Sequence, residues 1–130
     1  MFIDANIFIM ASLGRDKQSQ KCRDFLARVE SGEQKSVTSV LVMAEALKII
    51  GSRIGHEKAL PNVRRMMQIQ NLLIENVLTQ TLENSFEFFG LGMQPMDSLH
   101  LAVMKKHGIS TILSYDKDFD SIKGIKRVEP

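Results

Sequence analysis

MFIDANIFIM, residues 1–10, is an apolar run interrupted by one carboxylate, Asp4, and one amide, Asn6. Its β-branched and aromatic residues, with no Gly or Pro among them, are typical of a strand that is buried on both faces in a parallel sheet. We therefore expect a strand over 1–10 with Asp4 late in it. Burying a carboxylate costs several kcal/mol without a partner, and the stretch contains no Lys or Arg. Either Asp4 and Asn6 end the strand and cap the next element, or they join a site with residues from elsewhere.

The composition indicates an ordinary globular protein. A chain of 130 residues that is 44% hydrophobic and 25% charged is expected to form a single domain over residues 1–130. The only cysteine, Cys22, cannot form an internal disulfide, and we expect a half-buried thiol in a reducing compartment. No apolar stretch reaches the roughly 20 residues that a membrane span needs, and the N-terminus lacks the basic flank of a signal peptide. These features predict a soluble, cytoplasmic protein with no membrane partner.

The rest of the chain predicts helices and short strands in alternation. This alternation indicates a three-layer α/β/α fold with a central, mostly parallel sheet, in which the functional crevice lies beyond the carboxyl ends of the strands. Ser39 is the expected N-cap of a largely buried helix that ends at Gly51. The predicted helices cover 16–32, 40–50, 56–71, 81–92 and, after a loop kept open by Pro95, the segment up to Gly108; the later strands cover 36–38, 72–80, 109–116 and 125–129.

Four carboxylates fall where such a fold places its crevice. Asp4 lies in the first strand, Glu45 interrupts the apolar helix, Asp97 is the expected N-cap of its helix, and Asp116 closes a strand. Each has a simple structural explanation alone, but together they would repel one another and raise each other's pKa unless a divalent cation neutralised them. Oxygen ligands without His or Cys at chelating spacing favour magnesium or manganese over structural zinc.

Four fragments resemble, in order, the motifs of the PIN-domain ribonucleases and particularly of the toxin members called VapC-like. They are MFIDANIFI, SVLVMAEAL, MDSLHLAVMKKHGI and ILSYDKDFDSI. The resemblance implies a metal-dependent endoribonuclease whose acidic quartet, both catalytic and metal-binding, corresponds to Asp4, Glu45, Asp97 and Asp116. It implies Mg²⁺ or Mn²⁺ as cofactor. Supporting polar residues are expected at Asn6, Ser39, Ser114 and Asp120.

Hydrolysis by a metal-activated water is expected to leave a 5′-phosphate and a 3′-hydroxyl on single-stranded or looped RNA. The expected partners are RNA, a possible antitoxin protein, and possibly a second copy of the chain through the Met-rich segment RRMMQIQNLLI. His100 lies one turn beyond Asp97 and is a candidate general base, but its neighbours Leu99 and Leu101 favour a packed, hydrogen-bonded histidine.

Other interpretations stay open or fail on particular residues. The chain could be an RNA-processing PIN nuclease without a toxin role, or a non-catalytic module that binds RNA or protein. FIDANIF is unlike the D-x-D signature of aspartate-nucleophile phosphatases because Asn6 cannot protonate a leaving group. DKDFD is not a calcium loop because Ser121 and Arg127 stand where that loop needs Gly and Glu.

The last acidic position is ambiguous from periodicity alone. Along an extended segment Asp116, Asp118 and Asp120 would share a face. Asp116 directly follows a buried strand and is therefore the expected ligand. Phe119 is expected to anchor the turn and to direct Asp118 and Asp120 toward solvent or helix capping. Asp120 would then act at most in support.

Overall fold

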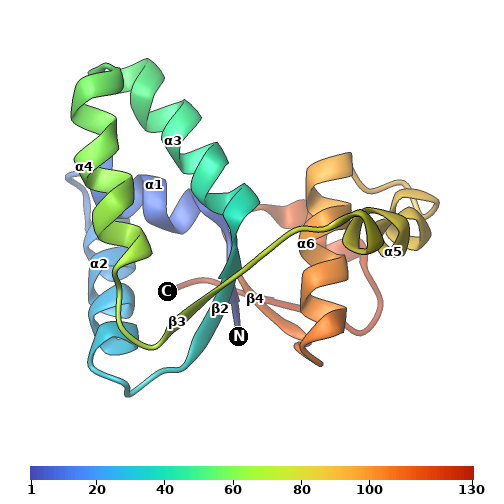
Figure 1. Ribbon diagram of the computed structural model, residues 1–130. Coiled ribbons are helices and arrows are strands. Elements are labelled where there is room, and N and C mark those ends of the chain that lie inside the picture. The colour runs from blue at the N-terminus through green and yellow to red at the C-terminus, as the bar shows by residue number, and fades with distance from the viewer.

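Five parallel strands form one sheet in the spatial order β3-β2-β1-β4-β5 (Figure 1). The computed structural model describes residues 1–130. Its elements in chain order are β1 (Phe2–Ile3), α1 (Ala5–Leu13), α2 (Lys17–Glu30), β2 (Ser36–Ser39), α3 (Val40–Ile54), α4 (His56–Met67), β3 (Leu72–Glu75), α5 (Thr79–Phe89), α6 (Pro95–Lys106), β4 (Thr111–Leu113), the 3₁₀ helix η1 (Lys117–Ser121) and β5 (Lys126–Val128).

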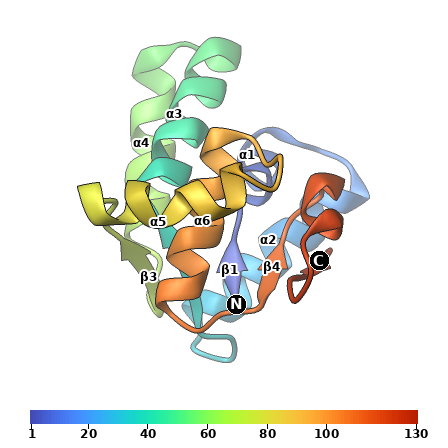
Figure 2. The ribbon, with the colours of Figure 1, turned by 90° about the vertical axis from the view of Figure 1, so that its right-hand side faces the viewer.

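Helices cover both faces of the sheet. Helices α1 to α4 pack on one face, and α5 and α6 pack on the other, with α5 outermost (Figures 1 and 2). The central strand β1 is completely buried, as are the inward residues of its neighbours. The predicted three-layer α/β/α fold is therefore confirmed. None of the helices combines the length and the apolar content that crossing a bilayer requires.

The strand expected over 1–10 is wrong beyond its first residues. Strand β1 ends at Ile3, and the remainder of the apolar run forms α1, with Ile7 and Phe8 fully buried. The side chain of Asp4 accepts a hydrogen bond from the Ala5 backbone N–H (2.6 Å) and so caps the helix. A short run that is apolar on every side fits a buried helix as well as a buried strand, so periodicity could not separate them.

Helix α3 begins as expected but extends further. Ser39 caps it, with Oγ 3.4 Å from the Val42 N–H. The helix passes Gly51 and stops only at Gly55, whose φ of +88° suits glycine. Gly51 lies inside the helix, where a Cβ would stand 3.1 Å from Cδ2 of His56, so α3 passes close to the start of α4 at this point. The helix is also less buried than expected, because Leu47 and Ile49 remain 38% and 40% exposed.

Three smaller expectations are also wrong. Helix α4 ends at Met67 rather than Asn71. Cys22 is fully buried rather than half-buried. Helix α6 starts at Pro95, so Asp97 is its third residue and not its N-cap. Proline at the first helical position costs no hydrogen bond, which lets the helix begin earlier than the acidic residue suggests.

Candidate metal centre

The four predicted carboxylates come from four elements that meet at the carboxyl edge of the sheet. Asp4 follows β1, and Asp116 lies three residues beyond β4. Glu45 is on α3, which follows β2 directly, and Asp97 is in the first turn of α6. The first turns of α3 and α6 stand on opposite sides of this edge, in the upper part of Figure 1. The parallel topology therefore brings together residues more than a hundred positions apart in the sequence.

Asp4 is the most firmly held of the four. It is only 7% exposed, and its Oδ2 accepts hydrogen bonds from Ser114 Oγ (2.6 Å) and Asn6 Nδ2 (2.6 Å). Asn6 Nδ2 also contacts Ser114 Oγ (2.9 Å), and its Oδ1 accepts from the Tyr115 N–H (3.3 Å). Burial raises the pKa of Asp4, although the hydrogen bond from Ser114 opposes that change. Asn6 and Ser114 thus both donate directly to the carboxylate of Asp4.

Glu45 is positioned by His100. The Nε2 of His100 lies 3.1 Å from Glu45 Oε2, and one ligand atom each of Asp4, Glu45 and His100 lie within 4.8 Å of one another. His100 is 1% exposed, its ring packs against Phe2 at a centroid distance of 5.5 Å, and its Nδ1 is buried without a partner. With Nε2 directed at Glu45 and Nδ1 out of reach of solvent, the histidine is packed and hydrogen-bonded, and it positions the carboxylate of Glu45.

Asp97 and Asp116 form a second group together with Asp118, which the sequence did not place among the expected ligands. Carboxylate oxygens of Asp97, Asp116 and Asp118 lie within 4.8 Å of one another. Asp116 accepts from the Asp118 N–H (2.9 Å) and so caps η1, while its own N–H donates to Ser114 Oγ (2.9 Å). Asp118 is exposed, as expected, but it also lies beside Asp97 and Asp116, a contact that the sequence did not predict. The segment is a 3₁₀ helix, so Asp118 and Asp120 do not share a face as they would in an extended chain.

Two predicted supporting residues lie outside this group of carboxylates. Asp120 pairs with Arg127, at 2.9 Å from Nε and 3.3 Å from Nη2, and Arg127 in turn donates to the Ser114 carbonyl (3.0 Å). Asp120 therefore reaches the site only through Arg127. Ser39 is fully buried and acts as the cap of α3, the helix that carries Glu45. Phe119 is fully buried and anchors η1, as expected.

The electrostatics of the site favour a cation. Burial raises the pKa of Asp97 to about 6, and the charges of Asp116, Asp4 and Glu45 add to this increase, while His100 opposes it. No Lys or Arg forms an ion pair with any of these four acids. A set of clustered carboxylate oxygens without a Lys or Arg partner fits a hard divalent cation, the ligand chemistry of Mg²⁺ and Mn²⁺.

Comparison with known proteins agrees with this geometry. Residues 1–125 match the model of the PIN domain family. Ribonuclease VapC23 of Mycobacterium tuberculosis is 31% identical over 121 residues, which cover 89% of this chain and 92% of that protein. Ribonuclease VapC13 of the same organism is 53% identical over 32 residues, a match that spans 25% of this chain and about a quarter (24%) of the relative.

Solved structures share the fold. VapC20 of M. tuberculosis, a toxin that cleaves the sarcin–ricin loop, superposes with a TM-score of 0.75 at 20% identity and 92% coverage of both chains. VapBC2 of Rickettsia felis, bound to a promoter DNA fragment, gives a TM-score of 0.69 at 16% identity, covering 98% of this chain and 96% of that one. The chain belongs to the PIN-domain family and, within it, to the VapC ribonucleases.

Proposed function

We propose that residues 1–130 form one nuclease domain that cuts single-stranded or looped RNA with Mg²⁺ or Mn²⁺ and serves as the toxin of a toxin–antitoxin pair. The observation that carries the proposal is the convergence of Asp4, Glu45, Asp97 and Asp116 at one edge of the sheet without a Lys or Arg partner. We assign these four carboxylates as the metal ligands.

The four carboxylates would hold a divalent cation, which when bound would lower the pKa of water to supply a nucleophile at neutral pH and would stabilise charge on the phosphodiester. The chain's own residues preorganise the site. Asn6 and Ser114 fix the carboxylate of Asp4, and His100 fixes that of Glu45. Because these side chains are locked by packing and hydrogen bonds, little reorganisation is needed when a phosphate arrives.

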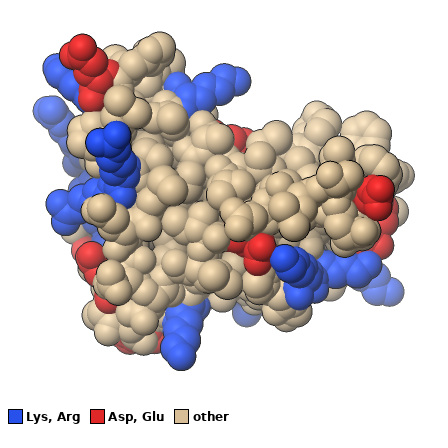
Figure 3. Space-filling model, viewed as in Figure 1, with Lys and Arg blue, Asp and Glu red and all other residues tan.

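RNA must approach a negative site, so nearby cations are required. Figure 3 shows Lys and Arg side chains mainly at separate margins of the face in view, not as one basic patch over the site. Two lysines are neighbours of the acids in the sequence: Lys48, one turn beyond Glu45 on α3, and Lys117, next to Asp116. Neither forms an ion pair, and Lys48 also lines a hollow between α3 and α4. A flexible single strand can bend between these charges toward the acids.

Purified protein is expected to cut single-stranded RNA in Mg²⁺ or Mn²⁺ and to lose this activity in excess EDTA, because no side chain of the site can replace the cation as electrophile. Gel analysis of labelled RNA, with activity restored by added metal as the control, tests this. Undiminished cleavage in EDTA would contradict the metal-dependent mechanism. Absence of cleavage under all metal conditions would favour the non-catalytic module.

We place the antitoxin on the face of the sheet that is covered by α1 to α4. A groove between α1, α2 and α4 has apolar walls that include Phe8, Leu26 and Met66, with Arg23 and Arg65 also lining it. Such a groove suits an amphipathic helix. The structurally similar Klebsiella pneumoniae protein was solved as a toxin–antitoxin complex; its TM-score is 0.66 at 17% identity, covering 95% of this chain and 93% of that one.

Substituting Ala27→Arg in this groove is expected to weaken inhibition by the co-encoded antitoxin about tenfold or more, because a charged side chain would be buried against apolar partner surface. Cleavage by the variant alone should be unchanged. Gln18→Arg, on the same helix but outside the groove, is the matched control. Equal inhibition of both variants would place the antitoxin elsewhere. Normal growth of cells that express the active enzyme alone would support the RNA-processing role instead.

A further inference from the structure

A polar pocket adjoins the metal centre between the loop before α6 and η1. It shares Asp118 with the group formed by Asp97 and Asp116, and Gln94, directly before α6, forms part of its wall. A nucleic-acid strand whose phosphate reaches the carboxylates therefore has this pocket as its immediate neighbour. The lining residues are Gly92, Met93, Gln94, Lys117, Asp118 and Ser121.

The walls of the pocket offer three kinds of contact. Gln94 is exposed, and its side-chain amide has no hydrogen-bond partner in the protein, so a donor and an acceptor are both available. Lys117 is exposed and forms no ion pair. Met93 is 5% exposed and supplies a thioether surface, with its sulfur 3.9 Å from Ser121 Oγ. Gly92 has a φ of +96° and open space where a Cβ would stand, which keeps the mouth clear.

This combination fits a nucleotide better than a protein side chain. A primary amide can both donate to and accept from a base edge, a lysine binds phosphate as a point charge, and a thioether packs against a flat ring. The apolar groove suited to an amphipathic helix lies between α1, α2 and α4, on the other face of the sheet. The pocket has only one hydrophobic residue among its six, so it offers little to a peptide.

We propose that this pocket is the subsite for the nucleotide next to the scissile phosphate, with Gln94 reading the base edge and Lys117 holding the adjoining backbone phosphate. The inference rests on the proposed function in that it takes RNA as the substrate. Gln94 and Lys117 are thereby specificity and positioning residues, and they take no part in holding the metal.

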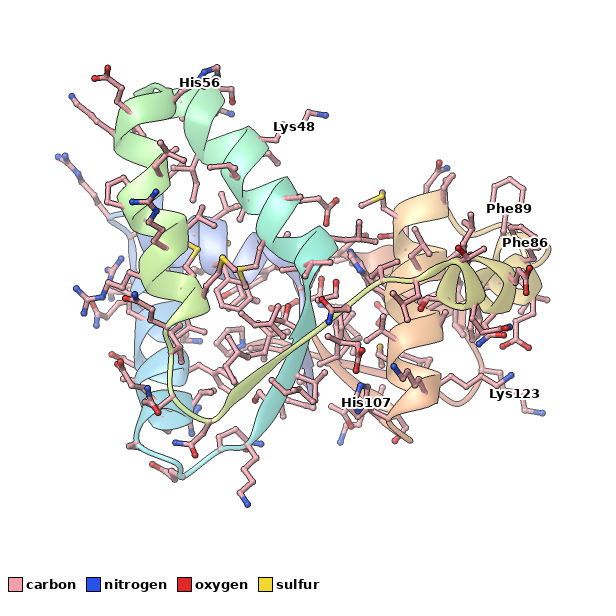
Figure 4. All side chains as sticks on the ribbon, in the orientation of Figure 1. Lys48, His56, Phe86, Phe89, His107 and Lys123 are labelled. Carbon is pink, nitrogen blue, oxygen red and sulfur yellow. The ribbon has the colours of Figure 1, made fainter.

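The test measures RNA binding separately from cleavage. Dye-labelled A, C and U homopolymeric ribo-oligonucleotides are titrated by fluorescence anisotropy with full-length Asp97→Asn protein in Mg²⁺, so that cleavage does not consume the probe. Lys117→Ala and Gln94→Ala are added to this background. Lys123→Ala is the matched control, because Lys123 is also exposed, lies outside the pocket and projects on the side away from the metal centre (Figure 4).

Lys117→Ala should raise Kd about fivefold and reduce the slope of log K against log salt by about 0.7, the value for one lost phosphate contact on a single strand. Gln94→Ala should change the ratio of Kd values among the three homopolymers about threefold or more. Lys123→Ala should match the parent.

Three results would overturn the subsite: no RNA binding by the parent, pocket variants indistinguishable from Lys123→Ala, or variants that weaken only inhibition by the antitoxin. If the native chain does not cut RNA but binding depends on Lys117 and Gln94, the nuclease proposal fails and the subsite stands.

Discussion

Asp97→Asn is expected to lower the cleavage rate about a hundredfold or more, equivalent to about 2.7 kcal/mol in the barrier, and at the same time to stabilise the metal-free protein. The activity falls because one charged ligand oxygen is lost from the site. Stability rises because burial and the charges of Asp116, Asp4 and Glu45 raise the pKa of Asp97. The charged form of this carboxyl group is therefore unfavourable in the folded state. The measurements are RNA cleavage and thermal unfolding in EDTA, with Glu83→Gln, an exposed carboxylate on α5, as the control.

The stabilisation should depend on pH with a defined sign. The folded-state pKa of Asp97 is raised from 3.8 to about 6, so the folded protein binds the proton more tightly than the unfolded chain does. Stability contributed by this group is therefore present below about pH 4 and is lost as the pH rises through about 6. Asp97→Asn should melt close to the native protein at pH 4 and roughly 3–5 °C above it at pH 7, for a solvent-discounted effect of about 1 kcal/mol.

Added Mg²⁺ should reduce the difference in melting temperature between Asp97→Asn and the native protein at pH 7, because it stabilises the native protein more than the variant. A gap in melting temperature that does not change with pH would mean that the charge of Asp97 is not the cause. A folded variant with normal turnover would remove Asp97 from the site.

Asp116→Asn should also reduce cleavage more than tenfold, about 1.4 kcal/mol or more in the barrier, and weaken Mn²⁺ binding measured by isothermal titration. The asparagine keeps an oxygen that can accept from the Asp118 N–H, so η1 retains its cap and the loss reports on the charge. Asp118→Asn should have a smaller effect, because Asp118 is exposed and its position depends on Asp116.

Asp120→Ala tests whether the metal ligand is Asp116, just beyond the end of β4, or a residue of the turn that follows. Asp120 pairs with Arg127 rather than with the other acids, so its loss should leave Mn²⁺ affinity within about twofold of the native value. If Asp120→Ala loses metal and activity while Asp116→Asn keeps both, the ligand assignment is wrong.

The fold was largely predictable because strands and helices alternate with clear glycine and capping signals. Where the prediction failed, the same sequence pattern was compatible with two different secondary structures. Residues 5–13 are mostly apolar, and burial of a helix against α2 and α3 is as compatible with that composition as burial of a strand. Gly51 looked like a helix stop, but the helix continues to Ile54 and Gly55, with a φ of +88°, takes the C-cap position; two glycines four residues apart offered the same stop signal.

Asp4 and Glu45 stood out in the sequence because each interrupts an apolar segment, whereas Asp97 and Asp116 were placed by the predicted element ends and by the resemblance to PIN-domain motifs. The contacts that support these acids were only partly predictable from the sequence. Asn6 and Ser114 follow strand ends and could be placed beside Asp4, but the pairing of His100 with Glu45 joins α6 to α3 and leaves no mark in the local sequence. Asp118 was missed because the direction of its side chain depends on whether residues 117–121 are extended or helical. The cap from Asp116 and the burial of Phe119 decide this.

Analysis of product ends in ¹⁸O-labelled water tests the central claim most directly, namely that this carboxylate cluster directs water to a phosphodiester. Mass spectrometry of cut single-stranded RNA should show a 5′-phosphate that carries one ¹⁸O atom and a 3′-hydroxyl, formed with Mg²⁺ or Mn²⁺ and absent with Asp97→Asn. A 2′,3′-cyclic phosphate with a 5′-hydroxyl, or product from Asp97→Asn at the native rate, would show that the RNA's own 2′-hydroxyl or another site performs the reaction, and would contradict the account.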